Sequence, residues 1–250
     1  MSTHSKLGAS ASHRWMHCPA SVQLINNFTS GGKSSIYSVG GHNAHEIAAK
    51  CLAQGTDAWE YIGQEIEEDG FTHVATDDDV TAIQFYLDRV RSLPNFNTAN
   101  RGIEIDFHCP DIHRDFFGQS DFVLYDDERI DVWDYKHGVG IAVSAEKNTQ
   151  LMMYATGVVR ELVKAGKKLP ERVQLTICQP RAFHPKGPVR SWETTVTSLE
   201  AWVQNEWLPA AKRTESNNPD YAAGDWCQFC PAKLECKMLQ EIRERTVRLH

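Results

Sequence analysis

The sequence lacks several features that would each indicate a particular class of protein. It has no apolar run near the roughly 20 residues that a membrane-spanning helix needs. Residues 1–15 contain no apolar core of the kind that a signal peptide requires, so we expect a cytoplasmic protein without a membrane partner. Positive charge is also scarce, because 26 lysines and arginines stand against 33 aspartates and glutamates, a formal net charge of −7. This balance argues against a broad nucleic-acid-binding surface.

The composition otherwise fits one globular domain spanning residues 1–250. Hydrophobic residues make up 41% of the chain and charged residues 24%, which allows a sizeable core. The seven cysteines are an odd number, and in a reducing compartment this argues against a disulfide framework. Four of them are spaced as a set: Cys18, Cys227, Cys230 and Cys236. The other three are expected to be buried thiols: Cys51, Cys109 and Cys178.

The pattern of apolar and turn residues predicts a mixed α/β fold, a β-sheet flanked by helices. Helices are expected at residues 19–28, 38–54, 76–93, 144–164 and 197–212, and from the cysteine segment to residue 250. Thr76 and Ser144 are the expected N-caps of two of them. Strands are expected at 102–109, 116–125, 129–136, 172–179 and 189–196. The second and third strands should pair as an antiparallel hairpin.

Two carboxylates and a lysine fall on this predicted hairpin. Asp134 and Lys136 are two residues apart on one strand, so their side chains point to the same face. Asp121 lies on the neighbouring strand and is expected to converge on Asp134. Close carboxylates repel each other unless a cation lies between them, and oxygen ligands suit Mg²⁺ or Mn²⁺. Together with the lysine, this set suits phosphodiester hydrolysis, although an Asp-x-Lys pair taken alone is common by chance.

Four motifs occur in order along the chain. They are Gly41-x-x-x-His45, Gly118-x-x-Asp121, Asp134-x-Lys136 and Gln150-x-x-x-Tyr154. This series resembles the motifs of the PD-(D/E)XK nucleases, and in particular their RecB-like branch. The resemblance implies a restriction-endonuclease-like core and metal-dependent cleavage of DNA. It favours an exonuclease that acts on DNA ends or single strands.

The resemblance also implies roles for individual residues. The metal would be held by His45, Asp121, Asp134 and the backbone carbonyl of Tyr135. Lys136 would be the catalytic lysine. Gln150 and Tyr154 would position the DNA and the metal site from one helix face. Glu46 and Glu104 are acidic neighbours of lower rank, and His137 stands where the family often has a small or hydroxylic residue.

The four spaced cysteines resemble those of the iron–sulfur nucleases, namely the CRISPR-adaptation exonuclease family and the AddB-type nuclease domains. There, one N-terminal and three C-terminal cysteines hold a 4Fe–4S cluster. The resemblance implies that residues 1–37 and 213–250 are joined by such a cluster around a nuclease core of residues 38–212. Zinc is the alternative occupant, and His17 is then an alternative to Cys18 as the fourth ligand.

A basic loop is the predicted DNA-contacting edge, comprising Arg181, His184, Lys186 and Arg190. Two other functions stay open. The first alternative to an active nuclease is a catalytically idle nuclease fold that binds DNA or a protein. The second is a subunit of a helicase–nuclease recombination complex. A motor would then be a partner, because the chain has no G-x-x-x-x-G-K-[ST] motif. The resemblance to small phage-encoded chains favours a role in recombination or DNA processing inside the host cytoplasm.

Overall fold

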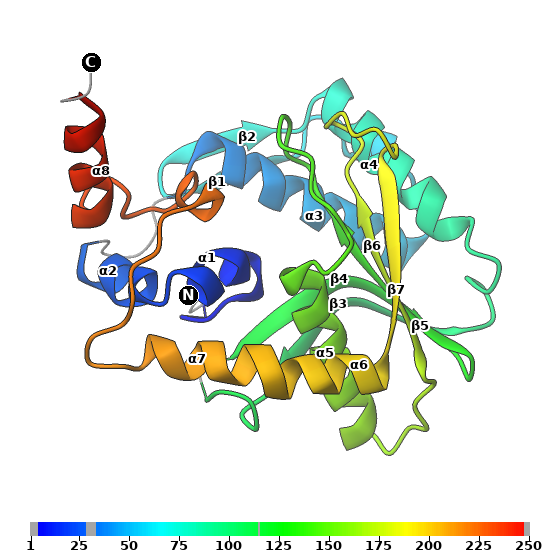
Figure 1. Ribbon diagram of the computed structural model, residues 1–250. Helices are drawn as coiled ribbons and strands as arrows, with labels where there is room; N and C mark the ends of the chain where they lie inside the picture. The colour runs from blue at the N-terminus through cyan, green and yellow to red at the C-terminus, as the bar shows by residue number, and fades with distance from the viewer. Residues whose placement is uncertain (1–4, 29–33, 115, 248–250) are drawn as a thin grey trace. The chain divides into compact units, whose positions relative to one another are not determined.

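The structure, a computed structural model, describes residues 5–28, 34–114 and 116–247 (Figure 1). The chain divides into two compact units. One, here called the sheet unit, comprises Ser34–Phe107 and Gln119–Leu199. The other, the cysteine unit, comprises Met1–Lys33, His108–Gly118 and Glu200–His250. The cysteine unit is therefore larger than the predicted segments 1–37 and 213–250, because it also contains residues 108–118 and 200–212.

A five-stranded mixed sheet confirms the predicted mixed α/β class. Its strands are β3 (Asn100–His108), β4 (Phe117–Tyr125), β5 (Arg129–Tyr135), β6 (Arg172–Cys178) and β7 (Val189–Thr195), in that spatial order. Strands β4 and β5 form the predicted antiparallel hairpin, with Phe122 opposite Trp133. Strands β5 and β6 are parallel, and the helix α5 (Thr149–Lys164) makes the long crossover that parallel strands need. Strand β7 returns antiparallel to β6.

Helices α3 (Ile36–Gln54) and α4 (Asp77–Arg91) build the main hydrophobic core of the sheet unit against β4 and β5. Ile47 of α3 and Ile83 of α4 are fully buried in the same cluster as Phe122 and Trp133. Thr76 caps α4 by accepting a hydrogen bond from Asp79 N, as predicted. The alternation along β5 leaves Asp134 free to face α5, from which Gln150 contacts it.

Two elements of the sheet unit differ from prediction. The helix expected from Ser144 begins at Thr149, because Asn148 is its cap and accepts from Leu151 N. A small antiparallel hairpin of β1 (Glu65–Glu68) and β2 (Phe71–Val74) was not predicted. Its turn residues Asp69 and Gly70 both have positive φ, at 51° and 81°. A short 3₁₀ helix, η2 (Ala58–Tyr61), precedes this hairpin.

The cysteine unit is helical. Its elements are η1 (Ala9–Ala11), α1 (Ser12–His17), α2 (Ala20–Phe28), the π-helix η3 (Val203–Trp207), α7 (Leu208–Thr214), η4 (Asp225–Cys227) and α8 (Lys237–Val247). The expected helix 197–212 is a continuous run of α6 (Val196–Trp202), η3 and α7. Trp15 and Trp207 are fully buried, and Phe116 meets Trp207 edge-on at 4.4 Å between ring centroids. The last three residues of the helix predicted to reach residue 250 lie outside the described residues.

The helices of the described segments are either too short or too polar for a hydrocarbon bilayer, and none of them qualifies as a membrane span.

Candidate functional site

Three potential metal ligands converge in the sheet unit: His45 of α3, Glu104 of β3 and Asp121 of β4. One ligand atom from each lies within 4.8 Å of the other two. His45 Nδ1 lies 3.5 Å from Asp121 Oδ2, and the backbone N–H of Tyr135 donates to the same carboxylate oxygen at 2.7 Å. A histidine nitrogen with two carboxylates suits a divalent cation. The structure thus brings together two predicted ligands and the lower-ranked Glu104.

An irregularity in β3 accompanies the position of Glu104. Its φ is +50°, in the left-handed region that residues other than glycine rarely adopt. Two residues earlier, a Cβ at Gly102 would lie 1.9 Å from Ile105 Cδ1, so the chain folds closely upon itself there. Gln119 on β4 donates to the Glu104 carbonyl at 3.3 Å and supports this local backbone.

The electrostatics of these three groups reflect their mutual proximity. Burial alone would lower the pKa of His45, but the Asp121 carboxylate overcomes it and raises the pKa to about 9. Burial would raise the pKa of Asp121, yet His45 and Lys136 hold it below its ordinary value. Burial and the Asp121 charge together raise the pKa of Glu104 to about 7. The site therefore concentrates negative charge that is only partly balanced by the protein.

A second set of polar side chains adjoins the first, and it contains Asp134, Lys136, Gln150 and Tyr154. Lys136 Nζ lies 2.9 Å from Asp134 Oδ2 and donates to Gln150 Oε1 at 2.8 Å. Gln150 Nε2 lies 3.2 Å from Asp134 Oδ1 and 2.7 Å from the Tyr154 hydroxyl. Burial raises the pKa of Asp134 to about 6, although the Lys136 ammonium opposes this rise. These four residues form one chain of contacts from β5 to α5.

Asp134, the Tyr135 carbonyl and Glu46 are three of the predicted site residues, and they differ in their surroundings. Asp134 is 1% exposed, and its carboxylate accepts from Lys136 and Gln150. It lies close enough to Asp121 for the two charges to affect each other's ionisation. The role of the Tyr135 carbonyl as a metal ligand stays a prediction. Glu46, the other lower-ranked acid, instead pairs with Lys50 at 2.6 Å on the exposed side of α3.

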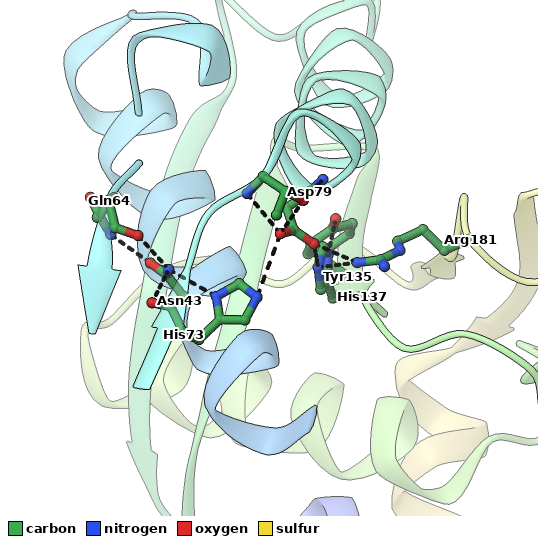
Figure 2. A network of polar contacts seen from close by, with 8 residues as sticks. Asn43, Gln64, His73, Asp79, Tyr135, His137 and Arg181 are labelled. Carbon is green, nitrogen blue, oxygen red and sulfur yellow. Dashed lines mark hydrogen bonds and ion pairs between the residues drawn. The ribbon is translucent and has the colours of Figure 1, made fainter. Parts of the chain in front are cut away.

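A polar network is centred on the buried Asp79 of α4 (Figure 2). His137 Nε2 and Arg181 Nη1 contact Asp79 Oδ1 at 2.8 and 2.6 Å, and the Tyr135 hydroxyl lies 2.8 Å from His137 Nδ1. His73 Nε2 lies 3.5 Å from the other Asp79 oxygen. His137, which follows the Asp-x-Lys motif, therefore contacts Asp79 of α4, which also binds Arg181 of the β6–β7 loop. Nothing in the local sequence indicated this role of Asp79.

The predicted DNA-contacting loop separates into two kinds of residue. Arg190 is 5% exposed, and its guanidinium donates to Val143 O, Gly187 O and Gln179 Oε1. Arg181 pairs with Asp79. His184 and Lys186 remain at the tip, where the Lys186 side chain is exposed and its backbone N–H donates to His184 Nδ1 at 3.0 Å. The two arginines thus hold the loop in place, and the tip carries the accessible basic groups.

The four spaced cysteines come together in the cysteine unit. Cys18, Cys227, Cys230 and Cys236 all line one cavity, of about 360 Å³ including its open mouth. All four are free thiols. Cys51, Cys109 and Cys178 are buried, as predicted. Among the described residues, His17 does not line this cavity, and its ring stacks on Trp226 at 4.4 Å.

Two polar side chains in the cavity wall lack partners. Arg14 Nε and Ser21 Oγ are buried and have no hydrogen-bond partner within the described part of the chain. Burial lowers the pKa of Arg14, while Cys230 and Cys18 act against this effect as neighbouring acids. A buried unpaired donor costs about 1–3 kcal/mol, so these groups call for an acceptor inside the cavity. An anionic group held by the thiolates would supply it.

The thiol spacing bears on the size of that group. Within the described residues, no three of the cysteines bring their sulfur atoms within 4.8 Å of one another, since only the His45 set meets that limit. Four thiolates on one zinc ion lie about 3.8 Å apart, because each Zn–S bond is about 2.3 Å long. A multi-iron cluster is bound at separate corners and spaces its thiolates more widely. A zinc ion and a multi-iron cluster would therefore require different sulfur spacings around this cavity.

One protein family matches both units of the chain. Residues 4–249 match the family described as "Protein of unknown function (DUF2800)", and the chain therefore belongs to this family.

Proposed function

We propose that this protein is a nuclease of PD-(D/E)XK type that uses Mg²⁺ or Mn²⁺ to hydrolyse phosphodiester bonds in DNA. One observation carries the proposal. The ligand set His45, Glu104 and Asp121 adjoins the ion pair that the buried Asp134 forms with Lys136, and these residues come from α3, β3, β4 and the end of β5. Residues of four motifs that are spread over positions 41–154 converge here, which chance spacing would not produce.

The donor set fits a divalent cation. His45, Glu104 and Asp121 would hold the ion, and Asp134 adjoins them through its interaction with Asp121. A bound Mg²⁺ or Mn²⁺ supplies Lewis acidity, which activates a water molecule and offsets charge on the phosphate. The Tyr135 N–H fixes the Asp121 carboxylate, so that its free lone pairs face the ligand set.

The lysine is the group that this chain contributes to the chemical step. Lys136 Nζ is held by Asp134 and Gln150, which fix its direction, while its side chain stays 24% exposed. An ammonium group in this position orients the attacking water and stabilises the charge that develops on the phosphate oxygens. Tyr154 anchors Gln150 and so supports the lysine from α5. An idle binding fold has no physical need for a lysine held against this buried carboxylate, which favours the enzyme.

We also propose that the cavity lined by the four cysteines holds a 4Fe–4S cluster. The four cysteines line one cavity together with Arg14 and Ser21, whose Nε and Oγ atoms have no hydrogen-bond partner in the described part of the chain, and this supports an anionic group bound there. Thiolates from α1–α2 and from the segment before α8 would then be linked covalently through the cluster. Because those residues lie more than 200 positions apart, closure of that loop would stabilise the cysteine unit.

The nuclease proposal is tested with the full chain and end-labelled DNA. Single-stranded and double-stranded oligonucleotides are incubated with Mn²⁺ or with EDTA, using wild type, Lys136→Met and Lys164→Met. Lys164 is a matched control, because it is an exposed lysine of α5 that pairs with Glu161. We expect Mn²⁺-dependent cleavage by wild type and the control, and a loss of about 100-fold or more in Lys136→Met. Equal inertness of all three with retained DNA binding would instead support an idle binding module.

A further inference from the structure

We propose that two neighbouring loops of the sheet unit form a platform that stacks against unpaired bases of single-stranded DNA, with Phe183 as the main contact. The loops are residues 137–143, which follow β5, and residues 180–188, which join β6 to β7. The proposal rests on the proposed function, because it identifies the strand that enters the site as single-stranded. It assigns a role to side chains that the catalytic series does not use.

Three large apolar side chains project from these loops into solvent. Phe183 is 88% exposed, Val139 is 61% exposed and Ile141 is 49% exposed. Single exposed apolar residues are ordinary on a protein surface. Here, however, three lie on two loops, one of which begins directly after Lys136, and Gln179, the residue just before the second loop, donates hydrogen bonds to Gly138 O and Ile141 O of the first. Three exposed apolar side chains on loops that adjoin the end of β5 are candidates for contact with a ligand.

Hydrogen bonds from Gln179 and Arg190 hold both loops in place, so the exposed side chains lie on ordered loops. Gln179 Nε2 donates to Gly138 O and Ile141 O, and its Oε1 accepts from Val143 N at 3.0 Å. The buried Arg190 bridges the loops by donating to Val143 O and Gly187 O at 2.8 Å each. A frame with this many internal hydrogen bonds presents Phe183 and Ile141 in fixed positions.

The Asp79 network extends this frame to the catalytic strand. Arg181 and His137, one from each loop, both contact Asp79 Oδ1 (Figure 2). The platform is thereby attached to the end of β5, on which Lys136 is carried. A base stacked on Phe183 would be fixed relative to the scissile phosphate by side chains of this chain alone.

The chemistry of the tip suits a single strand of nucleic acid. Phe183 offers a ring face without hydrogen-bonding groups, so it stacks on any base and reads no sequence. Lys186 is exposed three residues away and supplies positive charge for the phosphate backbone. In duplex DNA the base faces are already stacked on one another, so an exposed ring gains little there. The combination favours unpaired nucleotides over duplex DNA.

The test uses binding in place of cleavage, in the Lys136→Met background so that the DNA stays intact. A single-stranded oligonucleotide carrying 2-aminopurine is titrated against Lys136→Met alone and with Phe183→Ala or Phe229→Ala. Phe229 is a matched control, because it is 73% exposed but lies in the cysteine unit. We expect stacking to quench the 2-aminopurine fluorescence, and Phe183→Ala to abolish the quenching and weaken binding roughly tenfold. Phe229→Ala should leave both unchanged.

Failure of this inference is distinguishable from failure of the proposed function. Unchanged quenching and affinity in Phe183→Ala would overturn the platform, even if the wild type cleaves DNA. An equal loss of affinity for a blunt duplex would also overturn it, because the platform requires unpaired bases. Phe183-dependent binding by a wild-type chain that never cleaves would uphold the platform and remove the nuclease.

Discussion

Replacement of Asp79 by asparagine is expected to destabilise the sheet unit by about 3–5 kcal/mol, although the two side chains are nearly the same size. Asp79 is 4% exposed and accepts hydrogen bonds from several donors. Thr76 N and Thr76 Oγ1 donate to Oδ2 at 2.9 and 2.7 Å. His137 Nε2 and Arg181 Nη1 contact Oδ1 at 2.8 and 2.6 Å. An asparagine would place an NH₂ group against at least one of these pairs.

The magnitude follows from two contributions. Burial alone would raise the pKa of Asp79, but the donors of Thr76 and His137 lower it from 3.8 to about 2. This difference corresponds to about 2.4 kcal/mol of preference for the charged carboxylate in the folded state. Facing an amide NH₂ against buried donors costs a further 1–3 kcal/mol or so. The charge-dependent part has a defined pH dependence, because a lowered pKa stabilises the fold above pH 3.8 and this stabilisation is lost as the pH falls towards 2.

Hydrogen–deuterium exchange provides the assay, because it resolves peptides of α4 and β5 within a chain of two units. Asp78→Asn is the matched control, since Asp78 is an exposed carboxylate in the same first turn and should cost no more than about 1 kcal/mol. Urea denaturation of wild type and Asp79→Asn at several pH values tests the direction of the pH dependence. The difference in free energy of unfolding between the two proteins should become smaller as the pH falls from 3.8 to 2. Equal protection of α4 peptides in the two variants would refute the reasoning.

Three further predictions concern the sites. Mn²⁺ should raise the melting temperature of wild type, and Glu104→Gln should reduce this rise, as differential scanning fluorimetry would show. Lys186→Ala should lower the slope of log affinity for single-stranded DNA against log salt by about 0.7, whereas Arg190→Met should lower thermal stability and leave that slope unchanged, because Arg190 is buried. Cys230→Ala should lose iron and absorbance near 400 nm after anaerobic purification, whereas Cys51→Ala, in the sheet-unit core, should retain both.

Local sequence signals predicted the elements well where one signal stood alone. Thr76 was the single strong cap before α4 and was correct. Before α5 the chain offers both Ser144 and Asn148, and the helix begins after the second. Ser144 instead accepts from Glu146 N within a turn. Capping chemistry is equally available to both residues, so packing of the helix against the sheet decides between them.

The hairpin of β1 and β2 had a readable signal that the acidic composition obscured. Asp69-Gly70 is a typical two-residue turn sequence for an antiparallel hairpin, and both residues adopt the positive φ that such turns need. The flanking strands carry little apolar alternation, because β1 reads Glu-Ile-Glu-Glu. The turn chemistry was therefore a better guide than the hydrophobic pattern.

The candidate site shows the same division between local and tertiary information. Residues within one helix or one hairpin, such as Gln150 with Tyr154, were placed correctly by spacing alone. Glu104 depends on an irregular backbone in β3, which no periodicity reveals. Arg181 depends on Asp79, about a hundred residues earlier in the chain. Side chains whose partners are distant in sequence are those that spacing cannot assign.

The formal net charge of −7 is a poor measure of what a DNA strand would meet on this protein. It counts Asp79 and Asp134, which are buried and paired with cations of the same chain, equally with exposed carboxylates. It likewise counts Arg190, whose charge is enclosed within the loop frame. What remains at the platform is the exposed Lys186 beside Phe183, a surface with few charges and a large apolar contact. Binding there should consequently depend only weakly on salt, since few phosphates are neutralised, and chiefly on stacking.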